Sequence, residues 1–237
     1  QQNARLFSTD TSDVALNNTL ILFENSHVTV HGITAGKNCP LFLILSPMNF
    51  FVFRLHNSTL EASCAGYYAR LLELQNKAKA SDTTVELIDS TFNFNAALHL
   101  YFFLLRTPIP RDWTTLVLRS NISGHCAGGM SFLYNYENTI DGNLNLALVD
   151  SKVSMVSTYS ASHQNWNSFY DGFDPKHSRP VNITFRRTRI YYYSLYAVKL
   201  IDMDALDAKY SQGAVLTIED SHIKFDCLRP YAMLIGS

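Results

Sequence analysis

Residues 85–94, VELIDSTFNF, carry the pattern that decides the fold. Apolar residues alternate with polar ones on both sides of a central polar pair, Asp89–Ser90. Alternation with a period of two is typical of a β-strand that buries one face. A polar pair between two such runs favours a sharp change of direction. We therefore expect two short strands that meet at a corner.

The same pattern occurs seven times along the 237-residue chain. Each copy has a hydroxyl residue at its pivot, and the pivots are Ser26, Ser58, Ser90, Ser120, Ser151, Thr188 and Ser221. Successive pivots lie 32, 32, 30, 31, 37 and 33 residues apart. A repeat of this kind is typical of a solenoid, in which each unit buries its apolar face against its neighbours.

The columns of the aligned repeats indicate how the units stack. The third residue before each pivot and the second residue after it are apolar in all seven copies. A third apolar segment closes most units, at 41–45, 98–105, 130–134, 197–201 and 232–235. We predict an all-β fold, a right-handed parallel β-helix solenoid of about seven rungs, with roughly 32 residues and three short strands in each rung.

The residue directly before the pivot supports this register. In units three to seven it is Asp89, Arg119, Asp150, Arg187 and Asp220. Stacked rungs would place these side chains about 5 Å apart, with opposite charges as neighbours. Opposite charges attract modestly at a surface, whereas like charges repel.

Helices are the alternative in two segments. Residues 67–79 and 197–209 contain many residues that favour helices. With helices there, each unit would resemble a leucine-rich repeat. The pattern LxxLxLxxN of the leucine-rich repeat is absent from this chain. The period of the leucine-rich repeat is also shorter than the one found here.

We expect one solenoid domain over residues 1–237, with a loop insertion between rungs at 158–180 that lengthens the fifth repeat. The last repeat, at 215–225, is a full unit, and no obvious polar cap follows it. Because the ends of a solenoid need polar caps, we expect this chain to be part of a longer repeat array.

Composition excludes several classes of protein. With 47% hydrophobic and 16% charged residues, the chain is not intrinsically disordered. Its 19 basic and 20 acidic residues give a net charge of −1, which provides no overall field for nucleic acid. No apolar run approaches the roughly 20 residues that cross a bilayer. We expect no nucleic-acid partner and no membrane span in this segment.

The repeat unit resembles the repeats of the dispersed gene family surface proteins of trypanosomes and of related kinetoplastid membrane-associated proteins with β-helix repeats. The pairs that carry the resemblance, with their flanking alternations, are Asn25–Ser26, Asn57–Ser58, Asp89–Ser90, Asp150–Ser151 and Asp220–Ser221. The resemblance implies a very large, glycosylated, surface-exposed protein. It brings no catalytic residues.

Four acceptor sequences for N-glycosylation agree with an extracellular or cell-surface location. The acceptors are Asn17, Asn57, Asn121 and Asn182. The alternative is that these three-residue sequences occur by chance in a chain rich in Asn, Ser and Thr.

The four cysteines do not show whether the protein resides in an oxidising or a reducing compartment. Cys64, Cys126 and Cys227 share a column, but two or more rungs separate them. A disulfide needs Cα atoms within about 7 Å, so these three cannot pair with one another. Cys39 with Cys64 is the one pair that we consider. The alternative is four small buried thiols.

The insertion at 158–180 is the predicted binding site, because insertions in solenoids form loops that often bind ligands. The candidate residues, including two outward tyrosines of the next repeat, are Trp166, Phe169, Tyr170, Asp171, Asp174, His177, Tyr191 and Tyr193. Aromatic rings beside carboxylates are suited to sugars. The alternative is that these aromatic residues are buried and cover the core.

No catalytic motif is present, and the catalytic residues of any activity are unknown from sequence. The candidates for a carbohydrate-active site are acids at 202, 204 and 207 with nearby arginines at 186, 187 and 189. The alternative is a solvated loop and charge partners in the stack. No spacing of Cys and His matches a metal site, so we expect neither metal nor cofactor.

We therefore predict a non-enzymatic extracellular or cell-surface β-helix segment that acts in adhesion, in glycan binding or as a structural spacer. Its partners would be glycans or a protein of a host or neighbouring cell surface. The alternative is a carbohydrate-active β-helix enzyme, similar to a polysaccharide lyase or a glycoside hydrolase.

Overall fold

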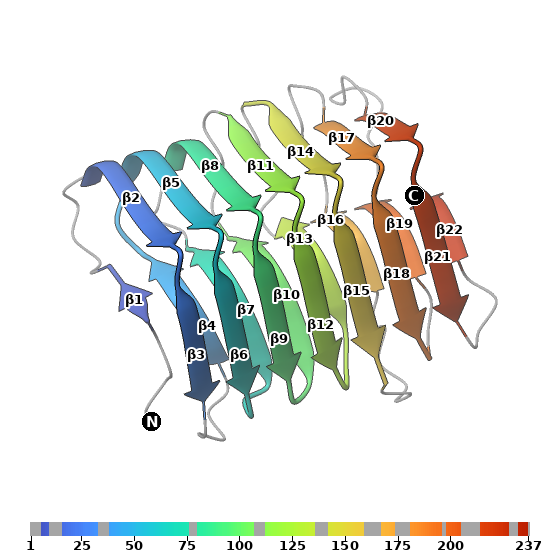
Figure 1. The fold of residues 1–237 in the computed structure, drawn as a ribbon, viewed down its shortest axis with the longest axis horizontal. Coiled ribbons are helices and arrows are strands. Elements are labelled where there is room, and N and C mark those ends of the chain that lie inside the picture. The colour runs from blue at the N-terminus through green and yellow to red at the C-terminus, as the bar shows by residue number, and fades with distance from the viewer. Residues whose placement is uncertain are drawn as a thin grey trace.

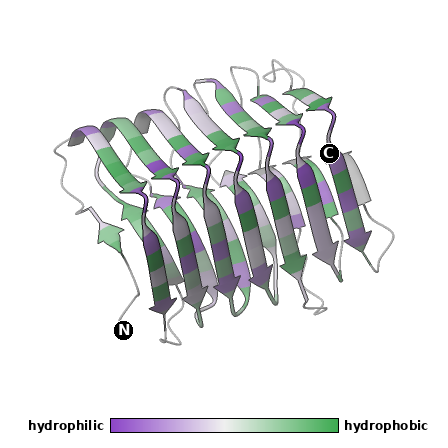
Figure 2. Cartoon of the chain, viewed as in Figure 1, coloured by the Kyte–Doolittle hydropathy of each residue, from purple (hydrophilic) through white to green (hydrophobic). Residues whose placement is uncertain are grey.

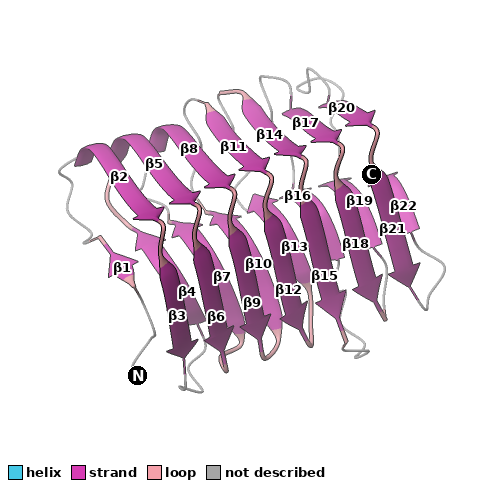
Figure 3. Cartoon of the chain, in the orientation of Figure 1, coloured by secondary structure: helices cyan, strands magenta, loops and turns pink. Residues whose placement is uncertain are grey.

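The fold was determined from a computed structural model, which describes residues 6–9, 16–32, 38–75, 80–106, 112–135, 142–158, 167–173, 181–195, 198–204, 214–227 and 232–236. In these residues all regular secondary structure is β-strand (Figure 3). The same part of the chain therefore holds no helix of the length and apolarity that crossing a membrane requires.

The strands form three parallel sheets (Figure 1). Sheet A contains β1 (Phe7–Ser8), β4 (Asn38–Ile44), β7 (Tyr68–Leu74), β10 (His99–Leu105), β13 (Met130–Asn135), β16 (Asn167–Phe173), β19 (Val198–Asp204) and β22 (Ala232–Gly236). Sheet B contains β2 (Leu16–Glu24), β5 (Met48–His56), β8 (Ala80–Ile88), β11 (Trp113–Leu118), β14 (Leu144–Val149), β17 (Val181–Arg186) and β20 (Ala214–Glu219). Sheet C contains β3 (His27–Gly32), β6 (Thr59–Cys64), β9 (Thr91–Ala96), β12 (Asn121–Cys126), β15 (Lys152–Ser157), β18 (Arg189–Ser194) and β21 (His222–Cys227).

The chain visits sheets B, C and A in turn and then begins the next rung. In Figure 1 it runs down the front through sheet C and returns behind through sheet A, and each turn advances toward the C-terminus. The coil is therefore right-handed, and the predicted parallel β-helix is confirmed. Sheet A has one strand more than predicted, because β1 precedes the first repeat.

The corner between sheets B and C is built by the polar pair of each repeat. The residue before each pivot, from Asn25 to Asp220, has a φ between 47° and 52°. This left-handed conformation is tolerated best by Gly, Asn and Asp. Five of the seven corner residues are Asn or Asp, and the other two are Arg119 and Arg187.

The pivot hydroxyls form a hydrogen-bonded ladder inside this corner. The backbone N–H of Ser58 donates to Ser90 Oγ (3.1 Å), that of Ser90 to Ser120 Oγ (3.0 Å), and that of Ser120 to Ser151 Oγ (3.1 Å). Each of these three acceptor hydroxyls donates in turn to the carbonyl two residues before it. The ladder satisfies backbone donors that the change of direction would otherwise leave buried and unpaired.

The core lies between the three sheets and follows the predicted columns. Along most strands of sheet C, hydrophobic and hydrophilic residues alternate (Figure 2). The inward positions of β12 and β15 include Ile122, Val153 and Met155, which are at most 2% exposed. At Gly124, also inward, an added Cβ would lie 2.9 Å from Leu100 and 3.0 Å from Phe102, so a larger residue would force these side chains to shift.

Sheet A departs from simple alternation, because each of its longer strands bends. Between β7 and β10, Arg70 pairs with Tyr101 and Leu72 pairs with Phe103, but no pairing is made at Leu71. Leu71 and Leu72 both lie in the core, so two successive side chains point inward. As a result, Arg70 and Glu73 both face outward, with 2.5 Å between Arg70 Nη1 and Glu73 Oε2.

The helical alternative is wrong in both segments where the structure describes them. Residues 68–74 form β7 and residues 198–204 form β19. The described side chains of both strands are largely buried, including Ala69, Leu74, Val198 and Leu200. Burial of apolar side chains on the sheet outweighs the modest intrinsic preference of these residues for helix.

The predicted loop at 158–180 is wrong over its central part. Residues 167–173 form β16, the third strand of the fifth rung, which pairs with β13 and β19. The repeat is therefore lengthened before this strand, because nine residues separate β15 from β16 whereas three separate β12 from β13. Residues 159–166 and 174–180 lie outside the described part of the chain.

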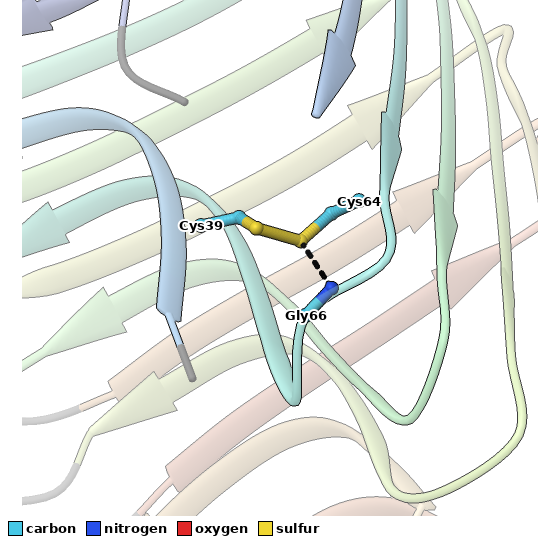
Figure 4. The surroundings of a disulfide bond; sticks show 3 residues. All are labelled: Cys39, Cys64 and Gly66. Atoms are coloured by element: carbon cyan, nitrogen blue, oxygen red, sulfur yellow. Dashed lines mark hydrogen bonds between the residues drawn. A yellow bond between two sulfur atoms is a disulfide. The ribbon is translucent and has the colours of Figure 1, made fainter. Parts of the chain in front are cut away.

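Cys39 and Cys64 form a disulfide with a Cα–Cα distance of 6.3 Å (Figure 4). The backbone N–H of Gly66 donates to Cys64 Sγ (3.2 Å). The interpretation of four free thiols is therefore wrong for this pair. Cys126 and Cys227 are free. Burial raises the pKa of the Cys126 thiol to about 12.

Candidate functional site

The predicted aromatic site on the insertion is not assembled as expected. Phe169 and Tyr170 are completely buried, because they occupy the bend of β16 and both point into the core. Their assignment as ligand-binding residues is therefore wrong. The backbone of Asp171 lies in β16 between those of Tyr134 and Asp202. Trp166, Asp174 and His177 lie outside the described residues.

The two outward tyrosines are placed as predicted. Tyr191 and Tyr193 lie on β18 and are partly exposed on the outer face of sheet C, while Tyr192 between them is buried. In register, Tyr191 lies between Ser154 and Lys224, and Tyr193 lies between Val156 and Asp226.

Lys224 and Asp226 of β21 complete a small polar group beside these tyrosines. Lys224 Nζ lies 5.5 Å from the centre of the Tyr191 ring and 2.8 Å from Asp226 Oδ2. The hydrogen bond from Lys224 holds the pKa of the Asp226 carboxyl below its usual value and raises the pKa of Lys224. Desolvation, followed by a hydrogen bond to Asp226, raises the pKa of Tyr191. The group is therefore ionised as a Lys–Asp pair at neutral pH, with a protonated tyrosine beside it.

A column of basic residues lies next to this group. Lys152, Arg189 and His222 are the first residues of β15, β18 and β21, and they stack in register on three adjacent rungs. All three are exposed, as is Lys224. We call these four residues, on the outer face of sheet C, the basic face.

The outer face of sheet A also carries aromatic residues, but their rings pack against one another. Tyr68 and His99 stack with ring centres 5.0 Å apart, and Tyr101 and Tyr134 stack at 5.1 Å. The Arg70 guanidinium lies 5.3 Å from the Tyr68 ring centre. Because sugars pack on the faces of aromatic rings, and these faces are occupied, this stack stabilises the sheet rather than offering a platform.

Two titratable groups on sheet A are shielded from solvent. Glu73 is completely buried and accepts hydrogen bonds from Arg70 and from Gln75 (3.0 Å), with Arg106 Nε 3.7 Å away. His99 accepts a hydrogen bond from the Gly129 N–H at Nδ1 (3.0 Å). Desolvation lowers the pKa of His99, so that the neutral imidazole is favoured.

The described residues of the predicted catalytic cluster belong to strands of different sheets or, for Arg187, to a corner. Arg186 pairs with Glu219 at 2.6 Å and Arg187 pairs with Asp150 at 2.6 Å, whereas Asp202 lies in β19 of sheet A. Asp207 lies outside the described residues. Arg186 and Arg187 are therefore charge partners in the stack, whereas Arg189 lies on β18 of sheet C. Among the described side chains, no group of three His, Cys, Asp or Glu could hold a metal ion.

Three of the four glycosylation acceptors are exposed, namely Asn17, Asn57 and Asn121. Asn182 is only partly exposed, and its Nδ2 donates to Asn145 Oδ1 (3.0 Å). Asn57 Nδ2 likewise donates to Asn25 Oδ1 (2.7 Å). Attachment of a glycan to Nδ2 of Asn57 or Asn182 would disturb these bonds. Asn17 instead accepts a hydrogen bond at Oδ1 from Asn49 Nδ2 (2.8 Å), so Asn17 and Asn121 are the better acceptors.

The sequence-based reasoning missed the basic face, although the signal was present. The signal is the column formed by the residue directly after each pivot. That column reads His27, Thr59, Thr91, Asn121, Lys152, Arg189 and His222, and it becomes basic in the last three rungs.

No protein-family model, curated protein or solved structure matches this chain. The resemblance to kinetoplastid surface proteins therefore stays a prediction.

Proposed function

We propose that this chain is a non-enzymatic extracellular or cell-surface solenoid that binds glycans through the outer face of sheet C. The observation that carries this proposal is the group formed by Tyr191, Tyr193, Lys224 and Asp226. It combines aromatic rings with charged hydrogen-bonding groups on a face that is partly open to solvent. Tyrosine offers both an apolar ring and a polar hydroxyl, which suits a ligand with both kinds of surface.

The disulfide and the acceptor sequences support the proposed location. Structural disulfides persist mainly in oxidising compartments, and Cys39–Cys64 is of this kind. The acceptors Asn17 and Asn121 are exposed on strands, where a glycan would project away from the core. Both features are expected of a protein that passes through the secretory route.

A glycan array tests the proposal. The wild-type chain should bind a defined subset of glycans, and the double variant Tyr191→Ala/Tyr193→Ala should lose this binding. Tyr67→Ala is the matched control, because Tyr67 is 59% exposed and belongs to the second rung, remote from β18.

The possible outcomes separate the candidate functions. Binding that survives the double variant would place the site elsewhere. No binding by a folded sample would leave a structural spacer as the function. Release of sugar products during the incubation would instead support the carbohydrate-active enzyme.

A further inference from the structure

We infer that the glycan is anionic, a sulfated or uronate-containing polysaccharide that lies along the solenoid axis on the basic face. This inference rests on the proposed function and specifies the class of its ligand. It starts from the stacking of Lys152 on Arg189 and of Arg189 on His222.

Stacking two cations in neighbouring rungs opposes folding. The rungs are about 4.8 Å apart, so the charged groups repel one another unless an anion lies between them. Within the described part of the chain, neither Lys152 nor Arg189 has an acidic partner. Two of the nearby carboxylates are used by other cations, since Asp150 binds Arg187 and Asp226 binds Lys224. The third, Asp220, lies in the corner column near Arg187.

Elsewhere the same solenoid avoids this cost by alternating the sign of stacked charges. Arg119 forms a bidentate pair with Asp89 of the preceding rung, with both distances 2.6 Å. Arg187 makes the same pair with Asp150, at 2.6 and 2.8 Å. Because charge is paired on the corner and left unpaired one column away, an anion from outside the chain is the natural partner of that column.

The geometry of the column favours a linear ligand. Lys152 and His222 are two rungs apart, which is about 10 Å along the axis. A polysaccharide chain that crosses the strands would meet one cationic side chain in each rung. Ser154, Tyr191 and Lys224 stack in register on the same three rungs, and the first two offer hydroxyl groups to the sugar.

The charge of the whole chain favours an acidic glycan over nucleic acid. The net charge is −1, so the long-range attraction that drives non-specific binding of nucleic acid is absent. The basic residues without an acidic partner that concern this proposal, Lys152 and Arg189, stack on one part of sheet C. Recognition then depends on local contacts with both charge and sugar hydroxyls.

The test compares acidic glycans with their neutral parents. The probes are a sulfated glucan and a polyuronate, each measured beside the unsulfated glucan or the carboxyl-reduced polymer, at several salt concentrations. We expect the acidic forms to bind at least tenfold more tightly, with an affinity that falls as salt increases. The double variant Lys152→Gln/Arg189→Gln should lose at least tenfold in affinity for them.

Arg186→Gln is the control for the loss of one such charge, because it removes a positive charge three residues away from Arg189, from an exposed arginine at the end of β17 in sheet B. Its affinity should stay within about twofold of wild type. Thermal unfolding of all variants checks that they remain folded.

Three results would overturn the inference. Equal binding of acidic and neutral glycans, lost in Tyr191→Ala/Tyr193→Ala, would keep the proposed function and refute the anionic ligand. Absence of binding to every glycan would refute the proposed function and the inference together. Equal binding of polyphosphate or single-stranded DNA would show a general attraction for polyanions instead of glycan recognition.

Discussion

Two adjacent residues form each corner between sheets B and C, one through its backbone conformation and the other through its side-chain hydrogen bonds. The first adopts the left-handed backbone conformation, and its side chain points along the outside of the corner. The second turns its hydroxyl inward and joins the ladder, where Ser120 is 2% exposed and Thr188 is fully buried. Both tasks are local, which is why the pattern repeats clearly in the sequence.

The ladder predicts a specific cost for losing one hydroxyl. Ser120→Ala removes the acceptor of the buried Ser90 N–H and should lower the free energy of unfolding by about 1–3 kcal/mol. Urea unfolding measures the change. Ser154→Ala, at an outward position of sheet C, is the control and should change stability by less than about 0.5 kcal/mol. Equal effects of the two variants would contradict a role for the ladder.

His99 predicts a loss of stability in mild acid. Its pKa is lowered from the ordinary value of 6.5 in the folded state, so the unfolded chain binds this proton more readily. The contribution of the neutral ring is complete above about pH 6.5 and is lost as the pH falls toward the lowered pKa. Unfolding free energies measured from pH 8 to pH 5 should decline less steeply in His99→Gln than in wild type. Parallel pH profiles would refute this assignment.

The residue-scale predictions from sequence succeeded where a pattern was repeated. The corner charges and pivot hydroxyls recur in many rungs, so their columns could be aligned. Phe169 and Tyr170 were misplaced because they belong to a bend that changes which side chains face inward. The residue types alone suggest an aromatic loop, and only the pairing of β16 with β13 and β19 shows that both residues are in the core.

The strands of sheet A show where an element differs from its expected form. Their apolar segments are nearly continuous, as in β10 (HLYFFLL), because the bend brings two neighbouring residues into the core and the outward positions are also mostly buried. A continuous apolar run does not distinguish a strand from a buried helix. For this reason the sequence alone did not decide whether the third segment of some rungs is a strand or a helix.

The disulfide links a strand of sheet A to a strand of sheet C, and it predicts sensitivity to reductant. Cys39 of β4 and Cys64 of β6 are 25 residues apart, and closing a loop of this size stabilises by about 3 kcal/mol. Reduction, or the variant Cys39→Ala/Cys64→Ala, should lower the unfolding free energy by that order. The control Cys227→Ser changes a free cysteine and should leave the sensitivity to reductant intact. A wild-type protein with equal stability in both redox states would contradict the prediction.

At the scale of the whole molecule, stability comes from contacts between neighbouring rungs. A rung in the middle packs against two others, whereas the first and last described rungs pack against one. The inward residues record this difference, since Ile122 in β12 is 2% exposed while Ile223 in β21 is only partly buried. Solenoids of this kind behave approximately as one-dimensional arrays with nearest-neighbour coupling.

The same substitution in two rungs measures that coupling. Ile122 and Ile223 occupy the same column, two residues after the pivot. Ile122→Ala should cost about 2–5 kcal/mol, as expected for a fully buried residue, and Ile223→Ala should cost less. Hydrogen exchange should show faster exchange across β9, β12 and β15 in the first variant, and changes confined to β18 and β21 in the second. Equal costs, or exchange that rises uniformly along the chain, would mean that the solenoid unfolds as a single cooperative unit in which position along the axis has no influence.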